Sequence, residues 1–290
     1  MSFKDIFNID AEVKESAHAR VNLIGEHTDY TGGYVMPTLL SFKNTIEISQ
    51  NNSNEFTVYS QHFKEKKTFN DFKKSTNNEW VDYIKGCLHI FFNENKISSK
   101  FLNIFISSDI PLERGISSSS ALCVATLKAL NTFFETKIKD PEIAKLAKKV
   151  EFNYIGVSGG IMDQMVSSIG IHGKAFFMNC KNLEYKLINF PENWKFCLID
   201  SEVQRNLRDS SYNERFAELQ EAEKKLGVEY LGEVKKENFQ TNKFDNNTIA
   251  KRAKHVVFEN DRVINAKKNL IENNIQAVSY THLTLPTIAK

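Results

Sequence analysis

The sequence predicts a mixed α+β protein, because strand-like and helix-like segments come in blocks rather than in strict alternation. Several short runs alternate apolar and polar residues or are continuously apolar, which is typical of strands. Other runs place apolar residues three and four positions apart, which is typical of helices that pack on one face. No internal repeat or long flexible linker divides the 290 residues. We therefore expect strands in hairpins with packed helices, and not a doubly wound parallel sheet.

Most of the strand-like segments precede the last third of the chain. We expect strands at residues 46–48, 56–59, 101–106, 174–178, 185–188 and 195–199. Each run is short and rich in β-branched or aromatic residues, which fit the pleated surface of a sheet.

The helix-like segments fall between and after these strands. We expect helices at residues 81–92, 119–134, 141–154 and 215–226. In the second of these, Leu122, Ala125, Ala129 and Phe133 follow the helical spacing of an apolar face. The last stretch, residues 277–290, has no helical period, so we treat it as a suspect, non-native tail and exclude it from the predicted fold.

Charge and composition exclude several classes of partner. The 38 basic and 36 acidic residues leave a net charge of only +2, so we expect no nucleic-acid partner. No apolar run is long enough for a membrane span and the N-terminus lacks a signal sequence, so we expect no membrane partner and a cytoplasmic protein. The 4 cysteines form no CxxC pair, and apolar neighbours such as Phe196 and Leu198 around Cys197 lead us to expect buried free thiols. We also expect a monomer.

A loop rich in small residues, here called the phosphate loop, follows the predicted strand at 101–106. It runs from Ser107 through Gly115 to a row of serines, Ser117 to Ser120, at the start of the predicted helix. The first N–H groups of a helix and the positive end of its dipole bind phosphate, and a serine hydroxyl is a ligand for Mg²⁺. The loop is neither GxxxxGK[ST] nor GxGxxG, and a serine-rich turn that caps the helix explains it equally well.

Two acidic residues are candidates for chemistry. Asp163 follows the pair Gly159 and Gly160, where the backbone can approach a ligand closely. A rigidly held aspartate near a phosphoryl-transfer site can accept or orient the proton of an attacking hydroxyl. Glu151, late in the predicted helix at 141–154, is a candidate metal ligand through hard oxygen. The alternatives are a helix cap for Asp163 and a surface ion pair for Glu151.

The segment from residue 20 to residue 33, here called the sugar segment, combines apolar anchors with crowded polar groups. Glu26, His27 and Asp29 lie within four residues, directly after Leu23 and Ile24. Such a density of charge needs a polar partner with many hydroxyl groups, which a sugar supplies. The segment lacks the HExxH spacing of a zinc site. We therefore expect a sugar-binding segment here.

These stretches together resemble one family. The run RVNLIGEHTDYTGGYVMP resembles the galactokinase signature, and PLERGISSSSA resembles the second motif of the GHMP small-molecule kinases. GGIMDQ resembles the galactokinase stretch that carries the catalytic aspartate. The motifs fall in the family's order between Arg20 and Gln164, and the resemblance reaches Tyr212. The joint match is specific, whereas the serine loop alone is weak.

The resemblance implies the two-lobed GHMP kinase fold. Its N-terminal domain, residues 1–190, would resemble domain 2 of ribosomal protein S5. A partial ferredoxin-like C-terminal domain, residues 191–276, would follow, before the suspect tail at 277–290. The third GHMP motif, a glycine-rich stretch, is not found in the sequence, which implies a chain truncated at its C-terminus.

The resemblance also implies an activity: transfer of the γ-phosphoryl group of MgATP to the C1 hydroxyl of galactose. This gives galactose 1-phosphate and ADP, the first step of galactose catabolism, with ATP and Mg²⁺ as cofactors. Asp163 would accept the hydroxyl proton, and Arg20 would stabilise the transferring group and lower the pKa of the reacting hydroxyl. The implied sugar contacts are Glu26, His27, Thr28, Asp29, Gly160 and Tyr212. The implied ATP contacts are Ser60, Gly115, Ile116, Ser117, Ser118 and Ser119, and the implied Mg²⁺ ligands are Ser119 and Glu151.

One departure from the family pattern lies beside the phosphate loop. Glu113 and Arg114 precede Gly115 where the family has small residues. Their side chains either point outward or narrow the ATP site. Three alternatives stay open: a GHMP kinase for another sugar such as N-acetylgalactosamine or arabinose, a catalytically inactive galactokinase-like sugar sensor, and a poorly folded, inactive chain.

Overall fold

The computed structural model describes residues 1–76, 79–111, 114–200 and 210–282, with side chains omitted at 210–212 and 279–282. Its contacts divide the chain into two compact units. The first unit contains residues 1–20, 40–157 and 163–169, and the second contains residues 21–39, 158–162 and 170–290. Each unit is thus built from separate stretches of sequence. The assignment of residues 1–190 and 191–276 to the two lobes of one kinase fold stays a prediction.

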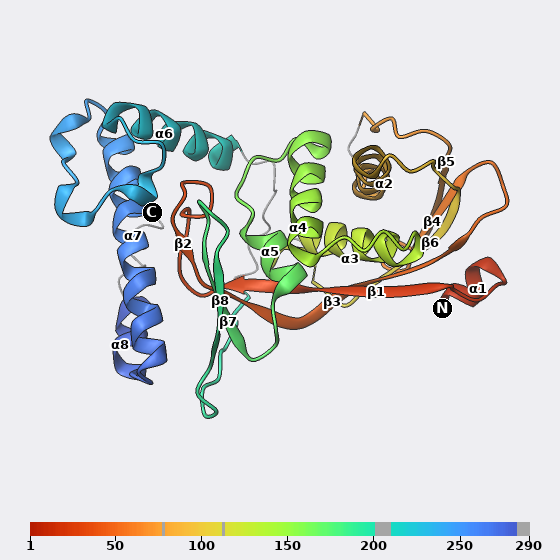
Figure 1. The fold of residues 1–290 in the computed structure, drawn as a ribbon, viewed down its shortest axis with the longest axis horizontal. Coiled ribbons are helices and arrows are strands. Elements are labelled where there is room, and N and C mark those ends of the chain that lie inside the picture. Colours follow the sequence, from red (N-terminus) through yellow and green to blue (C-terminus); the bar gives the residue numbers. More distant parts are fainter. Residues whose placement is uncertain (77–78, 112–113, 201–209, 283–290) are drawn as a thin grey trace. The chain divides into compact units, whose positions relative to one another are not determined.

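The first unit contains a sheet, a set of packed helices and a short N-terminal helix (Figure 1). Its strands are β1 (Val13–Asn22), β3 (Pro37–Gln50), β4 (Phe56–Ser60), β5 (Glu65–Phe69) and β6 (Leu102–Ser108). Its helices are α1 (Phe3–Phe7), α2 (Val81–Asn95), α3 (Ser118–Phe133), α4 (Asp140–Lys149), the π-helical turn η1 (Val150–Ile155) and α5 (Met162–Ile169). The ends of β1, β3 and α5 extend into the second unit. The mixture of helices and strands confirms the predicted α+β class.

The register of the strands sets where the phosphate loop leaves the sheet. β3 and β6 are antiparallel, with Ile46 opposite Ile106. β4 and β6 are parallel, with Ser60 beside Ile106, and β4 forms a hairpin with β5. Parallel strands end at the same edge of a sheet, so the end of β4 lies at the edge from which the loop after β6 departs.

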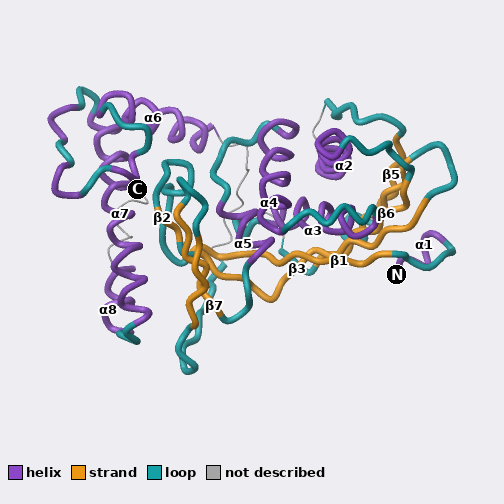
Figure 2. Tube along the Cα trace, viewed as in Figure 1, coloured by secondary structure: helices purple, strands orange, loops and turns teal. Residues whose placement is uncertain are grey.

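Helices α2, α3 and α4 cover one face of these strands (Figure 2). In α2, Ile84, Leu88 and Phe91 are fully buried and lie four and three positions apart. They pack in one core with strand residues such as Ile104. Burial of each large apolar side chain contributes roughly 1.5–3 kcal/mol, so this face holds the helices on the sheet. The predicted helices at 81–92 and 119–134 are confirmed.

The helix predicted at 141–154 changes its geometry before its end. α4 stops at Lys149, and η1 continues as a π-helical turn to Ile155. Gly156, with φ of +87°, then ends the turn in the left-handed region that favours glycine. Single π-helical turns are rare and occur frequently at functional sites. The turn places Glu151 in the core side of the unit, where its side chain is buried.

The second unit combines a small strand group with long helices. Its elements are β2 (Tyr34–Val35), the start of β3, β7 (Lys174–Asn179), β8 (Tyr185–Asn189), α6 (Ser210–Leu226), α7 (Asn247–Ile271) and α8 (Ile275–His282), with 3₁₀ turns η2 (Leu231–Glu233), η3 (Lys236–Asn238) and η4 (Thr241–Lys243). β7 pairs antiparallel with both β2 and β8. Apolar side chains of α7, such as Val263 and Leu270, pack with Phe177 of β7.

Several sequence predictions are wrong in this unit. Residues 195–199 form no strand, and Phe196, Leu198 and Ile199 are exposed. A short apolar run does not make a strand without a partner backbone to bond with. Residues 277–282, predicted to lack helix, belong to α8, whereas 283–290 lie outside the described residues.

The prediction of four buried thiols is correct only in part. Cys87 and Cys123 are buried, but Cys180 is partly exposed and Cys197 is exposed. Cys197 lies in the irregular segment after β8, where apolar neighbours in sequence do not become a core. Among the described helices, none is long and apolar enough to cross a membrane.

Candidate active site

The centre of the first unit's site is an ion pair between the residues predicted to be catalytic. Arg20, on β1, donates from Nε to Asp163 Oδ1 and from Nη2 to Asp163 Oδ2, each at 2.7 Å. The two side chains are 14% and 26% exposed, so the pair is largely shielded from water. Such two-pronged arginine–carboxylate pairs fix geometry as well as charge. The structure therefore brings Arg20 and Asp163 together, although 143 positions separate them.

The phosphate loop is attached to this pair. Arg20 Nη1 donates to the carbonyl of Gly115 at 3.0 Å, and its backbone N–H donates to the carbonyl of Ile116 at 3.2 Å. Ser117 Oγ donates to Asp163 Oδ2 at 2.5 Å. Gly115 and Ser117 both have positive φ, 71° and 63°, which turns the loop into the start of α3. The predicted ATP loop and the predicted base are thus held by one arginine.

A second cluster surrounds Glu151. Ser119 Oγ donates to Glu151 Oε1 and Ser120 Oγ donates to Oε2, each at 2.8 Å. Gln164 Nε2 also donates to Oε2. Burial raises the pKa of Glu151 above its ordinary value, these hydrogen bonds lower it in part, and the charge of Asp163 raises it further. The alternative of a surface ion pair for Glu151 is wrong, because the side chain is 6% exposed and its donors are neutral.

This second cluster fits a hard divalent cation. Mg²⁺ prefers carboxylate and hydroxyl oxygens, and Glu151 offers a buried carboxylate with the Ser119 hydroxyl 2.8 Å away. No group of three or more acidic, histidine or cysteine side chains gathers in the described part of the chain. A cation bound here would therefore take its other ligands from water or phosphate oxygens, as Mg²⁺ commonly does.

Gln164 and Ser120 were not among the predicted site residues. Gln164 is 4% exposed, and its Oε1 is buried without a hydrogen-bond partner among the described residues. The sequence marks these two residues only by their position next to predicted site residues: Ser120 follows Ser119, and Gln164 follows Asp163. Because Asp163 and Gln164 are neighbours on α5, one helix contacts both Arg20 and Glu151.

The remaining predicted residues of the nucleotide side are less closely linked. Ser60 is 3% exposed, and its Oγ accepts the N–H of Phe63 at 3.4 Å, so its side chain stabilises the turn after β4. It lies at the edge of the sheet from which the loop after β6 departs. Arg114 is exposed, and Glu113 lies outside the described residues. The side chain of Tyr212, in α6, is likewise outside the described part.

In the second unit, the sugar segment forms a compact series of turns. Glu26 is exposed, and its Oε1 accepts from Asn22 Nδ2 at 3.0 Å. His27 has a φ of +64°, and its Nδ1 lies 2.8 Å from the Tyr30 hydroxyl. Burial, with a smaller contribution from the charge of Asp29, raises the pKa of Tyr30, so this hydroxyl stays protonated beside His27.

Thr28 differs from its neighbours. It is fully buried, and its hydroxyl donates to the carbonyls of Gly25 at 2.8 Å and Tyr34 at 2.7 Å. Its side chain therefore closes the turn from inside, which is a structural role that the resemblance did not imply.

Asp29 and Gly160 lie against each other. A Cβ atom added to Gly160 would be 2.0 Å from Asp29 Oδ2 and 2.3 Å from its Cγ. No side chain fits at position 160 unless Asp29 moves, which explains the glycine in physical terms. Two predicted sugar contacts that are far apart in the sequence are thus brought together.

Residues of α7 anchor the sugar segment and were missed in the sequence. Glu259 Oε1 accepts the backbone N–H of Gly25 at 2.7 Å and that of Glu26 at 3.2 Å. His255 Nε2 lies 3.1 Å from the carbonyl of Glu26. Burial lowers the pKa of His255, so its ring favours the neutral form. No motif marks these residues, since they meet the segment only through folding.

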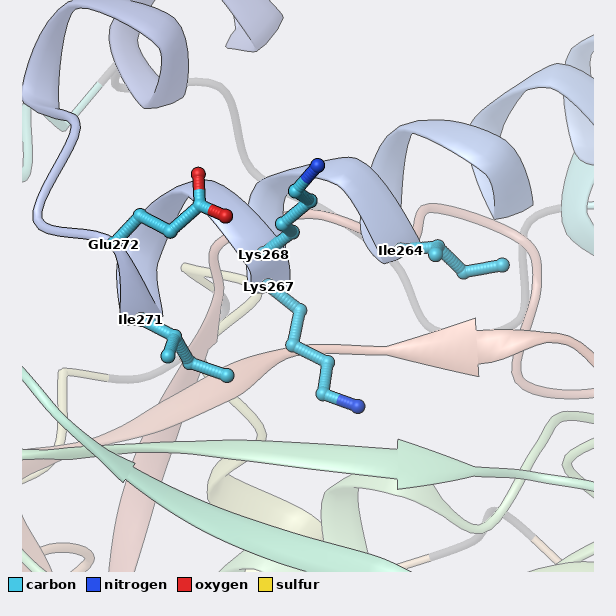
Figure 3. A pocket seen from close by; sticks show the side chains of 5 residues that line it. All are labelled: Ile264, Lys267, Lys268, Ile271 and Glu272. Carbon is cyan, nitrogen blue, oxygen red and sulfur yellow. The ribbon is translucent and has the colours of Figure 1, made fainter.

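A hollow lies along the C-terminal half of α7, away from the residues that anchor the sugar segment. Figure 3 shows its lining by Ile264, Lys267, Lys268, Ile271 and Glu272. Lys267 points toward the strands, with Nζ 4.2 Å from the centre of the Phe177 ring. None of these five side chains is a predicted site residue, so the hollow does not extend the sugar segment.

Comparisons with known proteins agree with the motifs. Residues 1–50 match the galactokinase galactose-binding signature, and residues 82–170 match the N-terminal domain of GHMP kinases. A galactokinase of Thermotoga petrophila is 35% identical over 267 residues, covering 92% of this chain and 74% of that protein. A galactokinase of Clostridium acetobutylicum is 32% identical and covers 98% and 77%.

Solved structures give the same result for the fold. The Lactococcus lactis galactokinase complexed with galactose has a TM-score of 0.88 and 30% identity, covering 96% of this chain and 75% of that chain. The mevalonate kinase of Methanococcus jannaschii has a TM-score of 0.58 at 20% identity, covering 94% and 80%, which is a likeness of fold alone.

Proposed function

The chain belongs to the galactokinase family of the GHMP kinases, and on that premise we propose that it phosphorylates galactose. The reaction transfers the γ-phosphoryl group of ATP to the C1 hydroxyl and gives galactose 1-phosphate and ADP. The observation that carries this proposal is the shielded pair of Arg20 and Asp163, with the phosphate loop bonded to both members.

Asp163 accepts or orients the proton of the attacking hydroxyl. A carboxylate has about four acceptor sites. Arg20 and Ser117 occupy both sites of Oδ2, whereas Arg20 Nε is the donor to Oδ1. Among the described residues, no donor takes the second site of Oδ1, and we assign it to the sugar hydroxyl. A fixed acceptor of this kind contributes about 10²–10⁴-fold to a rate.

Arg20 offsets negative charge on the transferring group. Its guanidinium is already fixed by Asp163 and by the Gly115 carbonyl, so it needs little reorganisation during the reaction. The N–H groups at the start of α3, from Ser118 onward, provide donors for the phosphates. Positioning and electrostatics supply most of the catalysis in phosphoryl transfer.

We propose Glu151 and Ser119 as the residues that hold Mg²⁺. The ion supplies positive charge to the phosphate oxygens when it is bound. Gln164 and Ser120 orient the Glu151 carboxylate through their hydrogen bonds.

The sugar segment supplies recognition. Glu26, His27 and Asp29 present acceptors and donors for sugar hydroxyls, and Gly160 leaves room for the Asp29 carboxylate. Tyr212 is retained as a proposed sugar contact on the resemblance alone. Thr28 supports the segment from within.

The direct test is galactose-dependent ADP release, measured in a coupled assay with MgATP. The panel includes galactose, N-acetylgalactosamine, arabinose and glucose at equal concentrations. We expect turnover with galactose to exceed that with each other sugar. If turnover is highest with another sugar, that sugar and not galactose is the preferred substrate. Binding of galactose and ATP without ADP release would indicate a sensor.

A further inference from the structure

Two consecutive residues of α7 hold the sugar segment in its middle and directly after its end. Glu259 Oε1 accepts the N–H groups of Gly25 and Glu26, at 2.7 and 3.2 Å. Asn260 Oδ1 accepts the N–H of Tyr34, directly after the segment, at 2.7 Å. The turns that carry the proposed sugar contacts therefore begin and end on one rigid helix.

Glu259 is itself held in place. Its side chain is fully buried, and Arg262 donates from Nε and Nη2 to Oε2 at 2.8 and 2.7 Å. One carboxylate oxygen thus bonds the arginine and the other bonds the sugar segment. Hydrogen bonds to a charged acceptor are stronger than neutral ones, and a buried carboxylate needs such partners.

Asn260 adds a second link through a neighbouring turn. Its Nδ2 donates to the carbonyl of Gly232 at 3.2 Å, and the Gly232 N–H donates to the carbonyl of Thr31 at 2.9 Å. The packing is close, since a Cβ atom on Gly33 would lie 2.9 Å from Asn260 Oδ1. The segment therefore has little room to shift against the helix.

We propose that Glu259 and Asn260 are positioning residues for sugar recognition, an inference that rests on the proposed galactokinase function. Neither belongs to the sugar segment. By fixing its backbone, they set the positions from which Glu26, His27 and Asp29 meet the sugar. Binding groups must be held closely to their productive geometry, and a helix holds them more rigidly than a loop does. Loosening this support weakens galactose binding more than it slows phosphoryl transfer.

The test compares Glu259→Gln and Asn260→Asp with the control Asp261→Asn. Glu259→Gln keeps the size of the side chain and one acceptor oxygen but removes the charge. Asn260→Asp keeps the acceptor for Tyr34 and loses the donor to Gly232. Asp261 is the next residue of α7, with a side chain 41% exposed.

The readouts are KM for galactose, KM for ATP, kcat, the melting temperature, and hydrogen–deuterium exchange of the peptide that covers residues 25–34. For Glu259→Gln we expect galactose KM to rise about tenfold, the effect of weakening one charged hydrogen bond. ATP KM and kcat should change by less than about twofold, because Glu259 bonds the sugar segment and not the phosphate loop. Hydrogen–deuterium exchange at residues 25–34 should become faster. Asp261→Asn should match the wild type. Simple destabilisation would reduce the active fraction, and so the apparent kcat, without moving KM.

The outcomes separate the two proposals. Unchanged galactose KM in Glu259→Gln, with normal wild-type turnover, overturns the positioning role and leaves the proposed function intact. Faster exchange without a change in KM overturns it as well. If Glu259→Gln does not melt cooperatively, Asn260→Asp is judged by the same criteria. If the wild type does not phosphorylate galactose, the proposed function fails and the inference fails with it.

Discussion

The proposed catalytic residues and the proposed sugar contacts are held in place in different ways. In the first unit, charged and polar side chains bond to one another, as in the contacts of Asp163 with Arg20 and Ser117. In the second unit, the backbone of the sugar segment is bonded by side chains of α7, and an outer residue such as Glu26 stays exposed. The first arrangement fixes reactive groups directly. The second fixes the backbone of the segment, from which the Glu26 side chain is exposed.

This difference predicts how substitutions divide between the two kinetic constants. Changes in the side-chain network should lower kcat, because they remove groups that act on the reacting atoms. Changes in the sugar segment should raise the galactose KM, because they remove binding that the ground state also uses.

The largest effect is expected for Asp163→Ala. Turnover should fall about a thousandfold, since the fixed acceptor is lost. Galactose affinity, measured by titration calorimetry, should stay close to that of the wild type. Turnover near the wild-type rate would show that another group takes the proton. Asp10→Ala, at an aspartate whose side chain is 79% exposed and lies outside both clusters, is the matched control.

Asp29→Ala should have the next largest effect, which should fall on the galactose KM and not on kcat. Loss of the charged group that we propose bonds a sugar hydroxyl should raise the galactose KM roughly a hundredfold. The ATP KM should not change. Sugar affinity equal to that of the wild type would remove Asp29 from the sugar site.

Gly160→Ala tests the contact between Gly160 and Asp29 with a single methyl group. The Asp29 carboxylate would have to move, because the new Cβ atom would lie 2.0 Å from its Oδ2. We expect galactose KM to rise about tenfold, less than for Asp29→Ala. Gly173→Ala, where an added Cβ atom meets nothing within 4 Å, controls for a lost glycine, although its φ of +75° adds backbone strain. An unchanged KM in Gly160→Ala would mean that Asp29 is free to adjust.

The smallest effect concerns stability and pH. Burial raises the pKa of Glu151 above 4.5 in the folded chain, so the folded state binds this proton more tightly than the unfolded state does. The resulting stability is present below the unfolded pKa and is lost as pH rises through the folded pKa. Glu151→Gln carries no titrating group, so the variant does not lose folding stability in this way as pH rises. The amide oxygen of its side chain can still accept from the neutral donors around it.

The melting temperature of Glu151→Gln without Mg²⁺ should therefore exceed that of the wild type. The gap should widen as pH rises from 5 to 8, a range that begins above the ordinary value of 4.5. The variant should lose Mg²⁺-dependent stabilisation, measured by melting with and without MgATP. A constant gap across this pH range would contradict a raised pKa.

Much of the fold was predictable because local patterns carry it. The apolar spacing of α2 and α3 depends on neighbours in sequence, and the structure confirms both helices. The strand predicted at 195–199 was wrong because pairing depends on a distant partner. The π-helical turn that places Glu151 was not predictable either, since a continuous helical pattern runs across residues 141–154.

The sequence by itself determined the family and the chemical groups. The sugar segment, the phosphate loop and the Asp163 motif are each a continuous stretch of sequence, so their order and residue types can be recognised directly. Only the tertiary structure decided the partners of those groups. Arg20 meets Asp163 across 143 positions, and Glu259 meets Gly25 across 234. A hydrogen bond between such distant residues has no period or spacing in the sequence, because it forms only where packed elements bring the two groups together.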